Sequence, residues 1–401
     1  MIVTKHTVVI ELCQPKTTDE EVRAKVTDML GKLPGIDGRL KRAKRIFIKL
    51  NLGISQAPSY LGRPFDCVDS AVFSGLAAFI RGRTSAQVLV GDGCDGIAPA
   101  DAARERGHLA IIEESGFQFV DLHQPPYTRF HIPDPTMFRW YELSSALQDI
   151  DLFISVAKMK SHHLCGVTLT MKNLFGLPPG PVYGSPRGAL HAAIRLPRIL
   201  ADLTQRFAPG ICLIDGIVGC NYAEWHGQGG DPVSPGILIA GDNAVATDAT
   251  AARCMGVDPA APRGTPPFLR ADNHIRTASE LGLGSLAGAD IDVIGEMPAE
   301  RKPFSVIGAA EPETFSQAER GREEVCRLAQ QYFDERDRYV REYRDEFMVL
   351  GKDGVLLHAP VAEVTSPVIF RTLSTEGLGL YEVFCKLVQA EESELRAPYA
   401  T

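Results

Sequence analysis

The sequence predicts an α/β fold, with a mostly parallel β-sheet covered by helices on both faces and a C-terminal helical appendage. Short apolar runs alternate with helical patterns over about residues 40–295, and parallel strands need such crossover connections. Residues 309–350 combine many charges with recurring apolar side chains, which is typical of long amphipathic helices. The composition, 45% hydrophobic and 23% charged, excludes a disordered chain.

Six short apolar runs predict the strands of this sheet, and the apolar residues 1–13 predict one more. The six runs are residues 45–50, 87–92, 118–122, 152–156, 211–215 and 236–241. Strands that alternate with helices in this way imply a largely parallel sheet with both faces covered.

Between the strands, apolar residues recur at the spacing of helices that pack one face on a sheet. Such helices are predicted at residues 19–33, 66–81, 191–207 and 243–255. Pro197 either kinks the third helix or marks its true start. Residues 178–188 hold the densest group of Pro and Gly and predict a loop.

Two regions are expected, an α/β core over residues 1–300 and a charged helical region over residues 301–401. In the second region, residues 309–350 predict one or two long helices, and residues 351–401 predict short mixed elements. The helical residues 309–350 offer a surface through which the chain could form a homo-oligomer.

Charge and cysteine content narrow the class of protein. A net charge of −8 argues against a nucleic-acid binder and against adhesion to an anionic membrane. No apolar run approaches the length that spans a bilayer. The nine cysteines are widely spaced without a CxxC pair, so neither a disulfide framework nor a zinc ribbon is indicated. We therefore expect a cytoplasmic protein.

The densest group of chemically active side chains lies in residues 157–179, after one of the predicted strands. If the strand continues, Lys158, Lys160 and His162 project from one face of it. Ligands bind at this end of strands in open α/β sheets. Ordinary surface lysines on a solvated edge strand are the alternative interpretation.

A second alternation follows, with Thr168, Thr170 and Lys172 on one face of a further extended segment. Together the two segments would direct three ammonium groups, an imidazole and two hydroxyls at one region. Ammonium groups so close together disfavour one another, which should lower a lysine pKa toward that of a useful base. The group would also bind a carboxylate or a phosphate.

Other predicted strands also end in polar groups. Lys49 and Asn51 follow the first strand of the core, and Asp92 and Asp215 follow two others. Asp248 lies one turn into the helix after residues 236–241. Turns use the same residue types, so each case alone is weak, but their recurrence favours a shared site. Asp92, Asp215 and Asp248 are the candidate metal ligands.

Two histidines could join the site from loops. His191 follows the Pro- and Gly-rich loop, and His226 lies in a Gly-rich loop after Asp215 that could close over a pocket. Loop histidines without a role are the alternative. The chain has no HExxH, P-loop or GxSxG motif, which leaves zincins, P-loop NTPases and α/β-hydrolases unsupported. Residues 91–96 (GDGCDG) are not a dinucleotide fingerprint.

The chain resembles domain-of-unknown-function family 362 over about residues 40–290. The motifs that carry the resemblance are residues 48–53 (IKLNLG), 90–93 (VGDG), 151–180, 213–219 (LIDGIVG), 239–259 and 281–284 (LGLG). Many members of that family are iron–sulfur proteins with a ferredoxin-like cysteine cluster. This chain has no CxxCxxC, so the resemblance implies no such cluster here.

A more distant likeness exists to the nickel-pincer lactate racemases. The pattern K-x-K-x-H, then Gly, then K-N-x-x-G-x-P, and later His191, is similar to their central region. The likeness implies a tethered nickel nucleotide held by histidine and lysine, with histidines as acid and base.

We therefore expect an enzyme that moves a proton on a small anionic substrate, such as an isomerase, racemase or lyase, with a divalent metal as a further option. The expected catalytic residues are Lys160, His162, Lys172, Asn173 and His191. The expected substrate-binding residues are Lys49, Asn51, Lys158, Thr168, Thr170 and His226. Two alternatives remain open: a redox or iron–sulfur-associated protein, since Cys94 and Cys165 lie inside the key motifs, and a non-catalytic ligand-binding protein.

Overall fold

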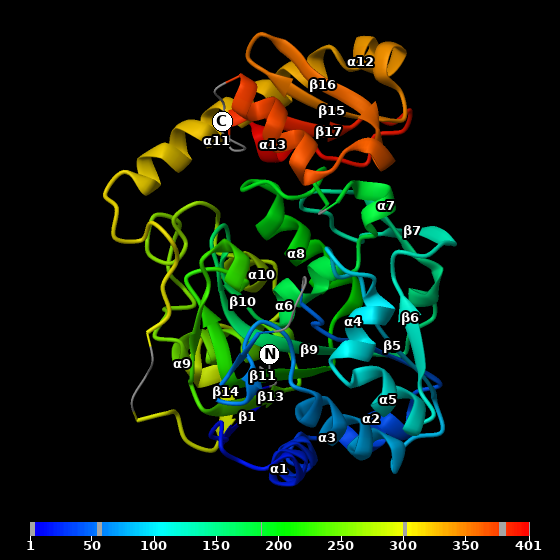
Figure 1. Ribbon diagram of the computed structural model, residues 1–401, viewed down its shortest axis with the longest axis vertical. Helices are drawn as coiled ribbons and strands as arrows, with labels where there is room; N and C mark the ends of the chain where they lie inside the picture. Colours follow the sequence, from blue (N-terminus) through cyan, green and yellow to red (C-terminus); the bar gives the residue numbers. More distant parts are fainter. Residues whose placement is uncertain (1–4, 54–57, 186, 300–302, 377–381, 401) are drawn as a thin grey trace.

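The computed structural model describes residues 5–53, 58–185, 187–299, 303–376 and 382–400 (Figure 1). Its largest element is a sheet whose main path has the strand order β14-β1-β13-β11-β9-β2-β5-β6. In chain order, these strands are β1 (His6–Leu12), β2 (Arg45–Lys49), β5 (Gln87–Asp92), β6 (Gln118–Asp121), β9 (Leu152–His162), β11 (Ile211–Asn221), β13 (Ile237–Gly241) and β14 (Ile291–Ile294).

Five neighbouring strands, from β11 through β9, β2 and β5 to β6, run parallel. Strand β13 is antiparallel to β11, and β1 is antiparallel to β13. Short β10 (Gly166–Thr168) and β12 (Asp231–Val233) extend β9 and β11 with antiparallel pairs. The predicted mostly parallel sheet is confirmed.

Successive side chains of each strand point to opposite faces of the sheet. Both faces therefore carry side chains, and helices cover both faces. In β2, Ile46 and Ile48 join one buried cluster, and Phe47 joins another. The helices with Ile46 and Ile48 are α1 (Asp19–Gly31), α2 (Ile36–Arg42), α3 (Ser70–Arg81), α4 (Pro99–Glu105) and α5 (His108–Glu114). The helices on the other face are α6 (Thr170–Asn173), α8 (Arg195–Phe207), α9 (Ala244–Cys254) and α10 (His274–Glu280).

The predicted helices at residues 19–33, 66–81 and 243–255 correspond to α1, α3 and α9. The helix predicted over residues 191–207 begins at Arg195, with Pro197 in its first turn. Proline is tolerated there because the first N–H groups of a helix have no partner inside it. The loop predicted at residues 178–188 contains one short helix, α7 (Gly180–Tyr183).

The direction of winding reverses between β2 and β9. From β2 the chain adds β5 and β6 on one side, then returns to add β9 and β11 on the other. In open α/β sheets, the crevice at the carboxyl ends of the strands beside such a reversal is the usual ligand site. The two strands that meet here carry Lys49 and Lys160 near those ends.

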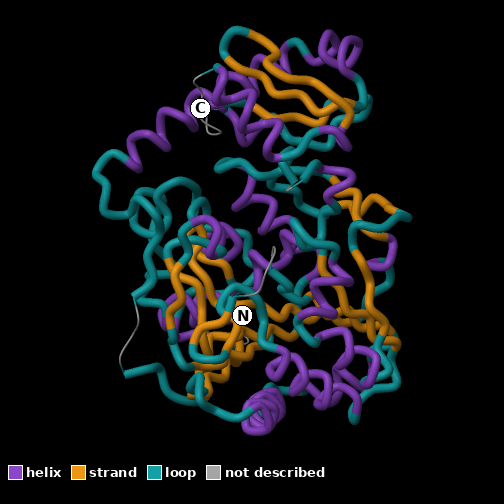
Figure 2. Tube along the Cα trace, viewed as in Figure 1, coloured by secondary structure: helices purple, strands orange, loops and turns teal. Residues whose placement is uncertain are grey.

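The C-terminal region forms a second, smaller layer at the top of the view in Figure 1. Its helices are α11 (Thr314–Asp334), α12 (Arg336–Tyr343) and α13 (Ser366–Thr375). Its strands β15 (Glu346–Gly351), β16 (Gly354–Pro360) and β17 (Phe384–Leu387) form an antiparallel sheet, which Figure 2 shows apart from the main sheet. The helical pattern predicted for residues 309–350 includes Phe347, but Phe347 lies in β15. The predicted helical range therefore extends too far toward the C-terminus.

Both regions contribute to one buried apolar cluster. Leu196 of α8 packs in the same cluster as Phe347 of β15 and Phe384 of β17. The predicted boundary at residue 300 therefore separates residues that share one apolar core. The two separate domains remain a prediction. The remaining described strands are β3 (Ser59–Tyr60), β4 (Arg63–Pro64), β7 (Tyr127–His131) and β8 (Trp140–Ser144). Within the described ranges, no helix combines the length and apolarity needed to cross a membrane.

Candidate functional site

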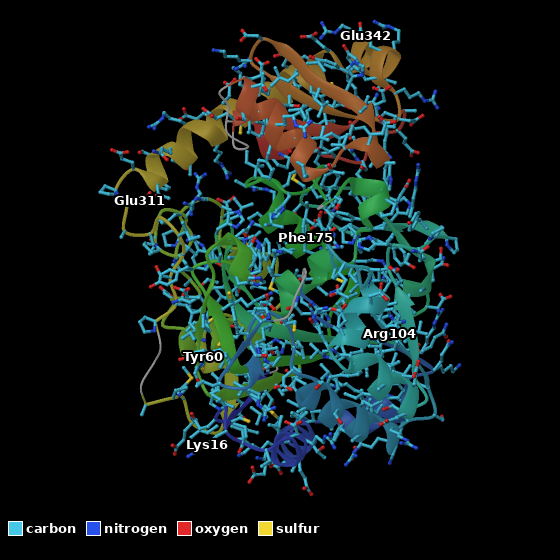
Figure 3. All side chains as sticks on the ribbon, in the orientation of Figure 1. Lys16, Tyr60, Arg104, Phe175, Glu311 and Glu342 are labelled. Atoms are coloured by element: carbon cyan, nitrogen blue, oxygen red, sulfur yellow. The ribbon has the colours of Figure 1, made fainter. Side chains whose placement is uncertain are left out.

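A cavity of about 520 Å³ lies at the carboxyl ends of β2, β5 and β9. We call it the central cavity. Residues of α6, the loop before α8 and the loop after β11 also line it, and Ile369 and Phe370 of α13 reach it from the C-terminal region. Phe175, one of its lining residues, is labelled near the middle of the molecule in Figure 3. The cavity therefore lies between the main sheet and the C-terminal layer.

Lys49, Asp92 and Asn173 form a buried network on one wall of the cavity. Lys49 Nζ lies 2.5 Å from Asp92 Oδ1 and 3.2 Å from Asn173 Oδ1. The Asn173 amide donates in turn to the Lys49 carbonyl, 3.0 Å away. Burial lowers the pKa of Lys49, although Asp92 acts in the opposite direction. All hydrogen-bonding positions of Lys49 are used, so this network mainly holds the ends of β2 and β5 in place.

Lys158 and Asp215 form a separate pair that does not line the cavity. Their Nζ and Oδ2 atoms lie 2.8 Å apart, and both side chains are wholly buried. Burial raises the pKa of Asp215, and the charge of Lys158 lowers it by less. Lys158 projects from β9 as the alternation predicts, but Asp215 on the neighbouring strand β11 already neutralises it. Substrate binding by Lys158 therefore gains no support from its position.

Lys160 and His162, the next alternate residues of β9, both line the cavity. Lys160 Nζ donates to the Asp66 carbonyl oxygen, 2.9 Å away, and has no carboxylate partner among the described residues. Thr168 of β10 lies directly opposite Lys160 in the strand pairing and also lines the cavity.

His162 is held in one tautomer by the chain that follows it. Its Nδ1 accepts N–H groups from Leu164, 3.1 Å away, and Cys165, 3.4 Å away. Burial lowers the pKa of His162 well below its ordinary value, so the ring is neutral. A neutral ring whose Nδ1 accepts carries its proton on Nε2. His162 is therefore a hydrogen-bond donor rather than a base, and its Nε2 lies 3.9 Å from Glu224 Oε1 in the cavity wall.

His163 and Glu224 form a pair that the strand pattern does not predict. His163 Nδ1 lies 2.9 Å from Glu224 Oε2. Burial alone would raise the pKa of Glu224, but His162 and the hydrogen bond from His163 outweigh burial and hold it well below its ordinary value. The strand alternation directs His163 away from His162, but β9 ends at His162 and the two rings stack 5.1 Å apart. Adjacent histidines at a strand end are the signal that could have found this pair.

Lys172 belongs to a helix rather than to the predicted second extended segment. The strand ends at Thr168, and α6 begins at Thr170, so Thr170 and Lys172 do not share a strand face. Lys172 Nζ lies over the Phe175 ring, 4.7 Å from its centre. Burial lowers the pKa of Lys172. Lys172 lines the cavity, and Thr170 does not.

Asp248 holds α6 from outside the cavity. Its carboxylate accepts the N–H groups of Thr170 and Met171, both 2.9 Å away, and the Thr170 hydroxyl at 2.5 Å. Burial raises the pKa of Asp248 to about 7. Asp248 and Thr170 therefore shape the start of α6 rather than meet a ligand.

His226 lies near the cavity without lining it. Its Nδ1 lies 3.1 Å from Asp66 Oδ2, and Asp66 also supplies the carbonyl that Lys160 contacts. Among the expected site residues, those that line the cavity are Lys49, Asn51, Asp92, Lys160, His162, Thr168, Lys172, Asn173 and His191. Those that the structure places elsewhere are Lys158, Thr170, Asp215, His226 and Asp248.

Three buried polar atoms in the cavity wall have no hydrogen-bond partner among the described residues. They are Asn51 Oδ1, Thr168 Oγ1 and His191 Nε2. Burial lowers the pKa of His191 to about 3, so its ring is neutral. Because buried polar groups are nearly always paired, these three atoms are expected to bind water or a polar ligand.

The candidate metal ligands Asp92, Asp215 and Asp248 do not come together. In the described part of the chain, the one group whose ligand atoms lie within 4.8 Å of one another is His162, His163 and Glu224. His162 fits a metal poorly, because its Nδ1 accepts backbone N–H groups and its Nε2 keeps the proton. The group fits a hydrogen-bonded acid–base array better than a metal centre.

The cysteines give no support to an iron–sulfur cluster. All nine are buried and free of disulfides, and none belongs to a potential ligand group within the described ranges. Burial raises the pKa of both Cys94 and Cys165, the latter to about 12. Both thiols therefore stay protonated.

A family model described as "Domain of unknown function (DUF362)" matches residues 46–253. This match confirms the family resemblance found in the motifs. It contains the residues that line the cavity from the main sheet and its helices, and it excludes those of α13.

A curated relative is the thylakoid-associated protein sll1697 of Synechocystis sp. It is 26% identical over 263 residues, which cover 64% of this chain and 77% of that protein. The likeness to nickel-pincer lactate racemases is not confirmed by these comparisons.

Two solved structures are distantly similar. A DUF89 family protein from Pyrococcus horikoshii is 15% identical, with a TM-score of 0.20 over 34% of this chain and 43% of that chain. A protein from Thermotoga maritima is 10% identical, with a TM-score of 0.32 over 55% of each chain. This chain thus spans about half the length of the solved structures that it matches.

Proposed function

The chain belongs to the DUF362 family, and we propose that this member is an enzyme that moves a proton on a small anionic substrate. The substrate carries a carboxylate or a phosphate, and the reaction is that of an isomerase, a racemase or a lyase.

The balance of charge in the cavity wall carries the proposal. Each lining carboxylate already has a partner: Asp92 pairs with Lys49, Asp95 with Arg187 and Glu224 with His163. The ammonium group of Lys160 also lines the cavity and has no carboxylate partner among the described residues. A buried cation without a carboxylate partner favours an anionic ligand.

The unpaired atoms Thr168 Oγ1 and Asn51 Oδ1 support the same ligand. The Thr168 hydroxyl, opposite Lys160 on the paired strand, donates to the anionic group. Asn51 Oδ1 is an acceptor and suits a hydroxyl or amine on the substrate. A substrate that carries an anionic group next to a carbon with a hydroxyl or amine satisfies both contacts.

Proton transfer is assigned to the histidine cluster. Glu224 accepts a hydrogen bond from the Nδ1–H group of His163, which leaves His163 Nε2 as the base. Catalytic histidines generally use this arrangement. His162 donates from Nε2 and stabilises negative charge that develops on a substrate oxygen. The base role expected for His162 thus moves to its neighbour, and Lys172 remains a second acid–base group.

The test is hydrogen exchange on candidate substrates. The full chain is incubated in D₂O with a panel of 2-hydroxy acids, 2-oxo acids and phosphorylated sugars. Loss of the substrate C–H proton next to the hydroxyl or carbonyl group is followed by NMR. In His163→Gln the exchange rate should fall about 100-fold or more, because the base is lost. The matched control is His358→Gln, which removes a similar histidine–glutamate pair on the exposed C-terminal sheet and should leave the rate unchanged.

An exchange rate that survives both His163→Gln and Lys160→Met contradicts the proposal. So does tight anion binding by calorimetry with no exchange on any member of the panel, which is the result expected of a non-catalytic binding protein.

A further inference from the structure

Lys172 is half-buried, and it differs from the fully buried lysines of this protein in having no oxygen partner. Lys49, Lys158, Lys160 and Lys386 each donate to a carboxylate or carbonyl oxygen at 2.5–2.9 Å. Lys172 contacts only the face of Phe175 among the described residues, and its side chain lines the cavity. Nothing in the described part of the chain neutralises its charge by direct contact.

This placement favours the neutral amine. Burial removes water from the ammonium group and lowers the pKa of Lys172, and Lys160 and Arg187 act in the same direction. The charge of Glu224 opposes this shift but does not reverse it. A neutral lysine amine in an anion-binding cavity is a nucleophile toward carbonyl carbon.

Groups that would assist such a reaction line the same cavity. His162 presents its Nε2 proton, and the buried Nε2 of His191 is unpaired. Loss of water from a carbinolamine needs a proton donor for the departing hydroxyl, and His162 is such a donor.

We propose that Lys172 forms an imine with the carbonyl group of a small anionic aldehyde or 2-oxo acid. The inference rests on the anion-binding cavity of the proposed function and names the substrate class. The amine nitrogen bonds to the carbonyl carbon, the C=O double bond opens and its oxygen takes a proton. The nitrogen then loses its remaining proton, the hydroxyl leaves as water, and a C=N bond replaces C=O.

The imine gives the proposed proton transfer a chemical reason. Once protonated, it withdraws electrons from the neighbouring carbon and makes a C–H bond there more acidic, so His163 Nε2 can remove that proton. Lys160 and Thr168 hold the carboxylate of the substrate meanwhile. No oxidant, reductant or further reactant is needed.

The test traps the imine on the full chain. The protein is mixed with glyoxylate, the smallest 2-oxo acid, and sodium cyanoborohydride at neutral pH, and modified lysines are located by peptide mass spectrometry. Reduction of the imine leaves one carboxymethyl group on the lysine. Lys172 should be labelled far faster than exposed lysines such as Lys16 and Lys41.

Two further measurements separate the outcomes. Lys172→Arg replaces the amine with a guanidinium group that is not a nucleophile, so it should still bind glyoxylate by calorimetry and lose the fast labelling, with folding checked by circular dichroism. Glyoxylate that binds the wild-type protein without preferential labelling of Lys172 overturns the imine and leaves the proton-transfer proposal standing. Neither binding nor labelling by glyoxylate, pyruvate or glyceraldehyde 3-phosphate overturns both.

Discussion

At the scale of single residues, one wall of the cavity depends on the close approach of the Lys49 and Asp92 side chains to the backbone of Gly176. A Cβ atom on Gly176 would lie 2.6 Å from both Asp92 Oδ1 and Lys49 Nζ. The lysine and the aspartate therefore sit directly against a backbone that has no side chain. Glycine at this position is required by packing and not by an unusual backbone angle, since Gly176 is not among the glycines with positive φ.

Gly176→Ala should consequently displace the ion pair of Lys49 and Asp92. We expect the free energy of unfolding to fall by about 1–3 kcal/mol, as overpacking a buried site usually costs. Gly82→Ala is the control, because a Cβ there meets nothing within 4 Å, and it should leave stability unchanged or slightly raised. Urea unfolding of both variants measures the difference, and equal effects would contradict this account of Gly176.

At the scale of elements, α6 carries Lys172 into the cavity, and Asp248 of α9 holds its first turn. The two segments are 78 residues apart in the chain. With a pKa of about 7 in the folded protein against an ordinary value of 3.8, Asp248 binds a proton in the fold that the unfolded chain releases. The stability that this bound proton contributes is fully present when the pH is below the ordinary pKa of the carboxyl group. It is lost as the pH rises through about 7.

Asp248→Asn removes this titration. The stability difference between wild type and variant should be larger at about pH 5 than at about pH 8, by on the order of 2 kcal/mol. Asp151→Asn is the control: Asp151 accepts the N–H groups of Lys44 and Arg45, and these bonds lower its pKa. Asp151 is thus ionised at both pH values, and its variant should lose the same stability at each. Urea titrations at the two pH values provide the measurement.

At the scale of the whole molecule, a buried ionic network joins the C-terminal region to the main body. Arg195 of α8 donates to Glu394 at 2.6 Å and to the Cys385 carbonyl at 2.6 Å. Lys386 and Tyr399 also donate to Glu394. Burial alone would raise the pKa of Glu394, but Arg195 and Lys386 hold it below its ordinary value. Glu394 is therefore the carboxylate partner of Arg195 at the junction of the two regions, and it shares Lys386 with Glu392, 2.7 Å away.

Glu394→Gln should leave Arg195 buried without a carboxylate partner, whereas Lys386 keeps Glu392. Removing one partner of a buried ion pair costs about 3–5 kcal/mol, so we expect a loss in that range. Hydrogen exchange should show α8 and β15 losing protection together, since they share one apolar cluster. Arg396→Ala, which breaks the exposed pair with Asp334, should change stability by less than about 1 kcal/mol. Loss of protection confined to β15 would instead support two independent domains.

Much of the fold is predictable from local sequence patterns. Apolar runs and helical spacing predict the central strands, α1, α3 and α9, because burial on a sheet imposes those spacings. The same reasoning places Lys160 and His162 on one side of β9, where they line the cavity. The pattern misses β15, whose Phe347 also fits the helical spacing of α11 and α12.

The partners of the charged residues are not predictable in this way. Lys158 and Lys160 have the same pattern in the sequence, but Asp215 of the adjacent strand neutralises only Lys158. Thr168, Thr170 and Lys172 alternate like a strand, but Asp248 caps a helix there instead. The pair of His163 and Glu224 forms because β9 ends and the chain turns.

The sequence by itself therefore determined the α/β class, the order of the central strands along the chain and the concentration of lysine and histidine at one strand end. Only the tertiary structure decided which of those side chains are neutralised and which remain unpaired toward the cavity. The physical reason is that periodicity reports which side of an element is buried, whereas the charge and protonation of a buried group depend on neighbours from distant parts of the chain.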